Sequence, residues 1–210
     1  MLREMDRPQF TRRQAAAAVA LPWIATALHA QPAAPRRATP SQTEGPFYPV
    51  ELPADTDFDL LRNGTLGYAR GRPAWVEGTL RDLDGRAVKG ATVEIWQCDE
   101  SGQYHHPGDN GKADAAFQGF GRVITDASGA WRFRTIKPAP YTGRTPHIHF
   151  KVKLGERELL TTQMYVAGDP HNDRDSLWRS LDEPSRNALT RTFASTSDGL
   201  RAEFPIIVKT

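Results

Sequence analysis

Along most of the chain, apolar and polar residues alternate in short runs that are separated by turn-forming residues. Alternation with a period of two is typical of β-strands that bury one face. In residues 130–136, for example, Trp131 and Phe133 share one face, and Arg132 and Arg134 share the other. We expect strands at residues 75–80, 91–97, 121–125, 130–136, 147–154, 158–166 and 204–208.

The turns between these runs indicate how the strands connect. The chain has 17 glycines and 16 prolines without a repeat, and the turn at 126–129 predicts a hairpin of strands 121–125 and 130–136. One short helix is expected at 182–192, with Asp182 as N-cap and Pro184 in its first turn. Many strands without a βαβ rhythm predict an all-β fold, a two-sheet antiparallel β-sandwich with long loops and at most one short helix.

The first 30 residues differ from the rest of the chain. Arg12 and Arg13 precede an apolar, alanine-rich run at 15–28, which is too short to span a bilayer as a helix. This order resembles a Tat-type secretory signal; the alternative is an amphipathic helix that stays attached. We expect a Tat-type signal peptide at 1–30, an extended N-terminal arm at 31–72, and at 73–210 the β-sandwich domain that carries the candidate catalytic residues. The expected location is periplasmic or secreted.

Charge and cysteine content narrow the classes of partner. The formal net charge is +2, and residues 1–30 supply +2 of it, from four arginines against Glu4 and Asp6. The remaining chain is near neutral, which gives no support for a nucleic-acid partner or for membrane attachment after signal cleavage. Cys98 is the only cysteine, so no internal disulfide can form, and we expect a buried thiol at a strand end.

A His-x-His pair is the strongest local signal for chemistry. On a strand, alternation places His147 and His149 on one face, about 6.6 Å apart along the strand. The opposite face carries Ile148, Phe150 and Val152, which can anchor the strand in a core. Two imidazoles that converge in this way can bind one metal ion, and the alternative is a pair of surface histidines.

The other ligands have to decide the metal. Between Trp131 and Lys153 the sequence has no cysteine, aspartate or glutamate, whereas Tyr141 lies six positions before His147. A phenol has a pKa near 10 and ionises at neutral pH only beside a strongly acidic cation such as ferric iron. Taken alone, a tyrosine such as Tyr141 is more often an ordinary loop aromatic than a metal ligand.

Three motifs follow one another in a specific order: WQCDESGQY at 96–104, TIKPAPY at 135–141 and RTPHIHF at 144–150. Together they resemble the intradiol ring-cleavage dioxygenases, most of all the protocatechuate 3,4-dioxygenase branch. The resemblance extends from TEGPFYP at 43–49 to LTTQMY at 160–165. It implies a non-haem Fe(III) ion with four protein ligands: Tyr104, Tyr141, His147 and His149.

The same resemblance implies roles in a reaction. A catechol-type substrate and O2 would be the partners, and the ring would open between its hydroxylated carbons to a cis,cis-muconate-type diacid, a step of aromatic hydrocarbon catabolism. Tyr141 would act as the base that accepts a substrate proton. Arg144 would stabilise negative charge on the ring, and Gln163 would face the substrate or support the site.

The sequence also departs from the family pattern. The loop between Tyr141 and Arg144 holds only Thr142 and Gly143, where better-known members carry a longer segment with a tryptophan. We therefore expect a more open site. The sequence does not identify the ring substituent of the substrate, the roles of His105 and His106, or the signal cleavage position. It also leaves open whether the chain forms a homo-oligomer or assembles with a second subunit.

Two other functions remain compatible with the sequence. A non-catalytic sandwich module could bind a carbohydrate or a protein through exposed Trp75, Trp131 and Trp178. A copper or zinc site could use His147 and His149 alone. Colour separates these hypotheses, because phenolate-to-Fe(III) charge transfer predicts a red protein, whereas a binding module or a zinc protein is colourless.

Overall fold

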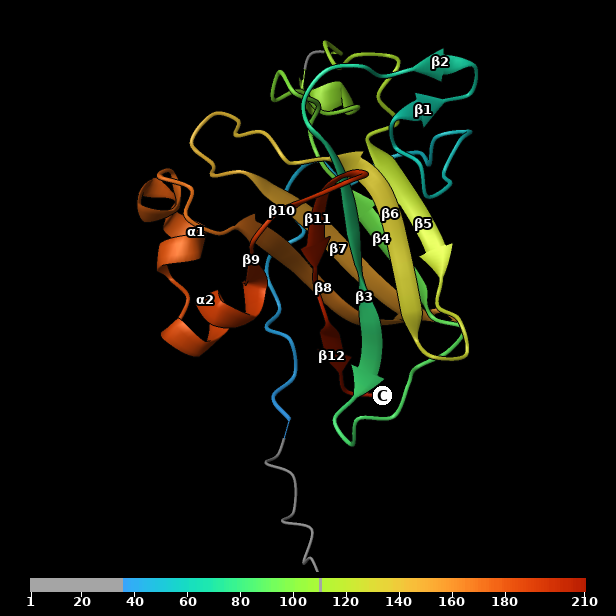
Figure 1. Ribbon diagram of the computed structural model, residues 1–210, viewed down its shortest axis with the longest axis vertical. Helices are drawn as coiled ribbons and strands as arrows, with labels where there is room; N and C mark the ends of the chain where they lie inside the picture. Colours follow the sequence, from blue (N-terminus) through green and yellow to red (C-terminus); the bar gives the residue numbers. More distant parts are fainter. Residues whose placement is uncertain (1–35, 110) are drawn as a thin grey trace, which may run out of the picture. The chain divides into compact units, whose positions relative to one another are not determined.

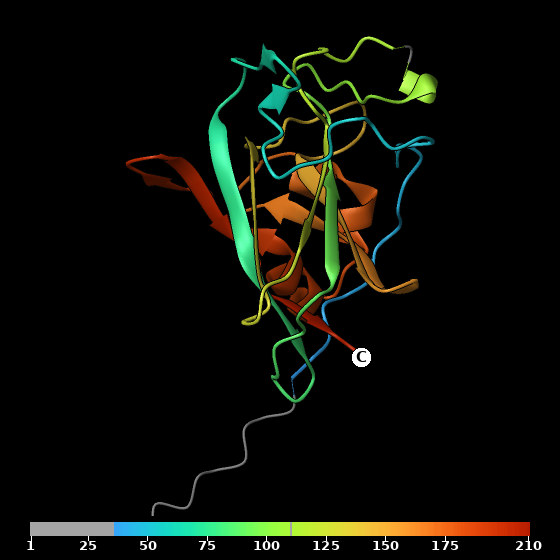
Figure 2. The ribbon, with the colours of Figure 1, turned by 90° about the vertical axis from the view of Figure 1, so that its right-hand side faces the viewer.

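The computed structural model describes residues 36–109 and 111–210 (Figure 1). The signal peptide expected at 1–30 lies outside these residues. Ten strands form two five-stranded sheets, which Figure 2 shows as separate layers. Sheet I consists of β3 (Pro73–Asp82), β6 (Ala130–Ile136), β10 (Ala194–Thr196), β11 (Gly199–Glu203) and β12 (Ile206–Val208). Sheet II consists of β5 (Phe120–Ile124), β4 (Thr92–Trp96), β7 (His147–Leu154), β8 (Arg157–Val166) and β9 (Thr190–Arg191), in that order.

The core lies between the two sheets. Val76 of β3 and Phe133 of β6 are fully buried, as are Ile95 of β4 and Phe150 of β7. The ring of Phe150 is 4.9 Å from that of Phe204, which directly follows β11, measured between ring centroids. Side chains from both sheets therefore interdigitate, as in a sandwich. The predicted all-β, two-sheet sandwich is confirmed.

Two details of the predicted fold are wrong. The pairing is not purely antiparallel, because β11 and β12 both pair with β3 in parallel, and β9 pairs with β8 in parallel. The described residues also contain two short α-helices instead of one, α1 (Ser176–Arg179) and α2 (Glu183–Leu189). Asp182 does cap α2, but the helix ends at Leu189, because the next two residues form β9.

The predicted hairpin at 121–136 is also wrong. The turn exists, because the side chain of Asp126 accepts hydrogen bonds from the backbone N–H groups of Ser128 and Ala130. The strands it joins belong to different layers, since β5 pairs with β4 and β6 pairs with β3. The alternating pattern identifies each strand but not its partner.

Sheet II positions the candidate site. β7 pairs with β4 on one side and with β8 on the other, both antiparallel. Its face away from the core is covered by residues 39–48, whose backbone bonds to β8 where Gln42 N–H donates to the carbonyl of Thr161. The short hairpin of β1 (Arg62–Asn63) and β2 (Leu66–Gly67) lies further along the same arm. Within the described residues, no helix has the length and apolarity to cross a membrane.

Candidate metal and catalytic centre

The two histidines project from β7 on the face away from the core. Both are only 1% exposed, whereas Ile148 and Phe150 on the opposite face are fully buried in the sandwich. The Nε2 atoms of His147 and His149 lie 3.1 Å apart. Two nitrogen ligands that bind one transition-metal ion at about 2.1 Å and at a right angle would be about 3.0 Å apart. The pair is therefore a buried, convergent donor set and not two surface histidines.

Their protonation suits metal binding. Nδ1 of His147 lies 2.6 Å from the carbonyl oxygen of Thr145, so we assign the proton to Nδ1 and the lone pair to Nε2. Burial, and then the charge of Arg144, lower the pKa of His147 to about 3. Burial, with His147 and Arg144, also holds the pKa of His149 well below its usual range. Both rings are therefore neutral and available as ligands.

Two loops bring tyrosines to these histidines. Tyr104 lies in the loop after β4, and its ring centroid is 5.4 Å from that of Tyr141 and 6.2 Å from that of His149. Tyr141, in the loop before β7, is 5.4 Å from His147 between ring centroids. The four residues expected as ligands therefore form one cluster of adjoining rings.

The polar atoms of this cluster fit a bound cation. The buried hydroxyl of Tyr104 has no hydrogen-bond partner among the described residues. The Tyr141 hydroxyl has a long contact of 3.5 Å, from Nη1 of Arg144. Burial raises the pKa of both phenols, that of Tyr104 to well above its ordinary value. A cation shared with the two imidazoles would satisfy these oxygens and favour their ionised form.

The donor set also indicates the kind of metal. Across residues 36–109 and 111–210, no three His, Cys, Asp or Glu side chains gather to share an ion. The phenols of Tyr104 and Tyr141 adjoin the two histidines and can supply further oxygen ligands. Two hard, anionic oxygens with two imidazoles fit ferric iron, whereas zinc or copper on the histidines alone would leave both phenols unused.

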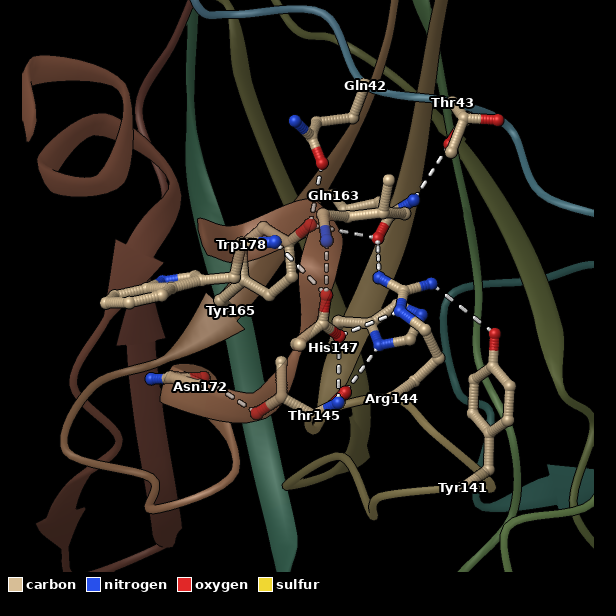
Figure 3. Close-up of polar contacts among 12 residues, drawn as sticks. Gln42, Thr43, Tyr141, Arg144, Thr145, His147, Gln163, Tyr165, Asn172 and Trp178 are labelled. Carbon is tan, nitrogen blue, oxygen red and sulfur yellow. Dashed lines mark hydrogen bonds and ion pairs between the residues drawn. The ribbon is translucent and has the colours of Figure 1, made fainter. Parts of the chain in front are cut away.

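Arg144 lies beside the cluster in a fixed orientation. Figure 3 shows its guanidinium between Gln163 and Tyr141. Nη2 donates to Oε1 of Gln163 at 2.6 Å, and Nε donates to Oδ2 of Asp175 at 2.8 Å. The Arg144 side chain is only 14% exposed. The guanidinium is thus a partly buried, oriented positive charge next to the hydroxyl of Tyr141.

Gln163 lies on β8 directly opposite His149 on β7. Besides accepting from Arg144, its amide nitrogen donates to the carbonyl of Thr43 at 2.8 Å (Figure 3). Gln163 therefore links the arginine to the N-terminal arm. These two bonds hold the Arg144 guanidinium in place. A direct contact between Gln163 and a substrate stays a prediction.

The arm and β4 enclose the rings from the remaining sides. Phe47 stacks on Tyr104 with ring centroids 4.6 Å apart. Trp96, the strand neighbour of His149, stacks on the His149 ring at 4.8 Å. A Cβ atom at Gly45 would approach Cε1 of His149 to 3.3 Å, so a residue without a side chain suits this close contact. These neighbours pack against the rings of Tyr104 and His149, which are 2% and 1% exposed.

A cavity of about 480 Å³ opens at the side of Tyr141 and Arg144. This volume is ordinary for a small-molecule site. The short loop of Thr142 and Gly143 forms part of its wall, together with Ser101, Pro140, His171, Arg174 and Asp175. A cavity of about 590 Å³ lies elsewhere, near Trp131 and Ile124. The smaller cavity adjoins the ring cluster through Tyr141, whereas the lining of the larger one contains none of the four rings.

Several supporting residues could not be identified from sequence. Asp175 lies 31 positions from Arg144, and no motif in the sequence links the two residues. Phe47 and Trp96 fall within recognised motifs, but their ring contacts depend on tertiary packing. His105 Nε2 lies 2.6 Å from the Phe117 carbonyl and 3.1 Å from that of Asp114, which gives it a role in fixing the loop.

Other candidate residues have structural roles. Cys98 is buried, and burial raises the pKa of its thiol to about 12, which leaves it protonated and unreactive. Trp131 is 4% exposed within the core. Trp75 is covered by the Arg132 guanidinium at 3.5 Å, and Trp178 Nε1 donates to the Thr190 hydroxyl. The tryptophans therefore do not form the exposed platform that a binding module would need.

Comparison with known proteins shows which family the chain belongs to. A family model described as "Dioxygenase" matches residues 43–208. The protocatechuate 3,4-dioxygenase beta chain of Burkholderia cepacia is 36% identical, over 78% of this chain and 76% of that protein. Hydroxyquinol 1,2-dioxygenase of Rhodococcus opacus is 35% identical, over 81% of this chain and 64% of that protein.

A solved structure agrees with these matches. The dioxygenase domain of a dioxygenase carbohydrate-binding protein fusion from Streptomyces sp. SirexAA-E has a TM-score of 0.66 and 30% identity, and the match covers 83% of this chain and 99% of that one. The chain spans about half the length of several of the catechol and hydroxyquinol dioxygenases that it matches. Since the family model covers most of the chain and these relatives exceed 30% identity, the chain belongs to the intradiol ring-cleavage dioxygenase family.

Proposed function

We propose that this protein is a non-haem Fe(III) intradiol dioxygenase that uses O2 to cleave a catechol-type ring between its hydroxylated carbons, giving a cis,cis-muconate-type diacid. The convergence of two buried imidazole Nε2 atoms at 3.1 Å with two adjoining phenols carries this proposal. Tyr104, Tyr141, His147 and His149 would hold the iron. When bound there, ferric iron would be chelated by the two catechol oxygens and would activate the ring toward O2.

The chain's own residues supply the rest of the chemistry. Tyr141 lines the cavity, so its phenolate oxygen is within reach of a substrate hydroxyl and would accept that proton. Arg144, held by Asp175 and Gln163, would stabilise the negative charge that develops on the ring. Trp96 and Phe47 would keep water from the ligand rings.

Oxygen uptake by the purified protein tests this function. A panel of catechol, protocatechuate, hydroxyquinol and chlorocatechols should show one O2 consumed per ring, with a diacid product that contains both atoms of that O2, one in each new carboxyl group. Resorcinol, whose hydroxyls are not adjacent, should give no uptake because it cannot chelate. A product cleaved beside the two hydroxylated carbons, and not between them, would contradict the proposal.

We also propose that the protein is exported by the Tat pathway and acts in the periplasm or outside the cell. Arg12 and Arg13 before an apolar run support this, and the Tat route carries folded proteins, so iron could be inserted before transport. A fusion of residues 1–35 to a reporter should reach the periplasm only when Tat is intact. Arrival through Sec alone would contradict this part of the proposal.

Assembly is a separate part of the proposal. A relative named as a beta chain suggests a homo-oligomer or a dissimilar second subunit. Light scattering of the protein expressed alone, measured beside O2 uptake, separates the two. Full activity of a single-chain species would show that the site needs no second subunit.

A further inference from the structure

Asp175 is a buried carboxylate that accepts four hydrogen bonds. It is 1% exposed. Its Oδ2 accepts from Nε of Arg144 at 2.8 Å and from the backbone N–H of Thr145 at 2.9 Å. Its Oδ1 accepts from the backbone N–H groups of Leu177 and Trp178 at 2.9 and 3.1 Å, where it caps α1. One side chain thus joins the segment before β7 to the segment after β8.

This contact sets the direction of the catalytic guanidinium. A guanidinium is planar, so fixing Nε and one further nitrogen fixes all its donors. Asp175 holds Nε, and Gln163 holds Nη2 at 2.6 Å. Nη1 is then left pointing toward the Tyr141 hydroxyl at 3.5 Å, at the wall of the cavity. Without Asp175 the guanidinium could rotate about its remaining contact.

We propose that Asp175 is a positioning residue of the reaction, which acts through Arg144 by holding the guanidinium toward Tyr141 and the substrate. This inference rests on the proposed function. Asp175 has no direct contact with any of the four expected iron ligands in its hydrogen bonds. Its effect on turnover should therefore vanish when Arg144 is already removed.

The carboxylate cannot be replaced by its amide. All four partners of Asp175 are N–H donors, and both carboxylate oxygens accept. Asparagine has one acceptor oxygen, so either rotamer turns its NH2 group toward two donors. Because the oxygen can keep capping α1, Asp175→Asn is expected to release Arg144 and Thr145 while the fold persists.

Steady-state kinetics with a double-variant comparison test this inference. Asp175→Asn should lower kcat by about 10- to 100-fold, less than the loss expected for removing a charge-stabilising donor outright. Arg144→Gln should lower kcat further, and the double variant should match Arg144→Gln alone. The control is Asp182→Asn, which alters another N-cap carboxylate, one that accepts from Ser185 N–H but does not contact Arg144; its kcat should equal that of the unmodified protein.

The visible spectrum of the resting protein supplies a readout other than activity. Asp175→Asn and Arg144→Gln should shift the phenolate-to-iron band in the same direction, because both alter the donor beside Tyr141, and Asp182→Asn should leave it unchanged. An unchanged kcat in Asp175→Asn, or losses that multiply in the double variant, would overturn the positioning role. If the unmodified protein lacked both band and O2 uptake, the proposed function itself would fail and this inference with it.

Discussion

At the scale of single residues, buried neutral histidines make the metal-free protein sensitive to acid. Burial and Arg144 lower the pKa of His147 to about 3, against about 6.5 in an unfolded chain. Between these values the unfolded state binds a proton that the folded state does not, so stability falls as the pH falls. The pKa of His149 is lowered as well, so it acts in the same direction.

Urea unfolding of the metal-free protein between about pH 7 and pH 4.5 measures this effect. The free energy of unfolding should fall with decreasing pH by up to about 1.4 kcal/mol per pH unit for each histidine. His147→Gln should show a shallower dependence, because glutamine does not titrate. An equal slope in both proteins would mean that other groups cause the acid sensitivity.

Residues differ in how far sequence could identify them. His147 and His149 could be placed on one face because strand alternation is local. Tyr104 and Tyr141 sit in loops, where no periodicity applies, and were identified by their motifs alone. Asp175 could not be connected to Arg144, because the contact depends on how the segment after β8 folds back over 31 positions.

At the scale of elements, β7 also holds the N-terminal arm. Lys151 lies two positions after His149 on the same face, and its side chain is 8% exposed. It forms an ion pair with Glu44 and lies 3.8 Å from the centroid of the Tyr48 ring. The same strand therefore carries the histidines and anchors the arm that covers them.

Removing this anchor should loosen the arm. Glu44 is partly exposed, so we expect Glu44→Gln to lower the free energy of unfolding by only about 1 kcal/mol. The larger effect should be faster proteolysis within residues 40–50, monitored by mass spectrometry. Arg37→Gln, which removes a pair with Asp182 between two largely exposed side chains, is the control and should cleave at the original rate. Equal cleavage rates of both variants would show that the backbone hydrogen bonds of the arm are enough to hold it on the sheet.

The sequence predicts where the strands lie better than it predicts which strands pair. β6 lies where alternation predicted it. The two strands that pair with β3 in parallel, β11 and β12, are distant from β3 in the sequence. Phe204 and Pro205 separate them from each other. Parallel pairing depends on contacts that no local pattern encodes. The class of fold could therefore be predicted, but the order of strands in the sheets could not.

At the scale of the whole molecule, the short loop before Arg144 should broaden substrate choice. Thr142 and Gly143 place no bulky side chain on their part of the cavity of about 480 Å³. Even a hydrophobic pocket wall that contacts the substrate distinguishes two substrates that differ by one methylene by only about 1–3 kcal/mol. We expect kcat/KM values for several substituted catechols within about tenfold of one another, which is about 1.4 kcal/mol. A preference of about a thousandfold for one substrate would require a wall from another segment or subunit.

The central claim is that two tyrosines and two histidines bind one ferric iron, and iron content measured together with the visible spectrum tests it most directly. The purified protein should contain one iron per chain and be red, from phenolate-to-iron charge transfer. His149→Ala should lose iron and colour together, because one of four ligands is gone. His171→Ala, whose ring pairs with Asp169, should keep both. A colourless protein that binds zinc in place of iron, or full colour in His149→Ala, would contradict this account.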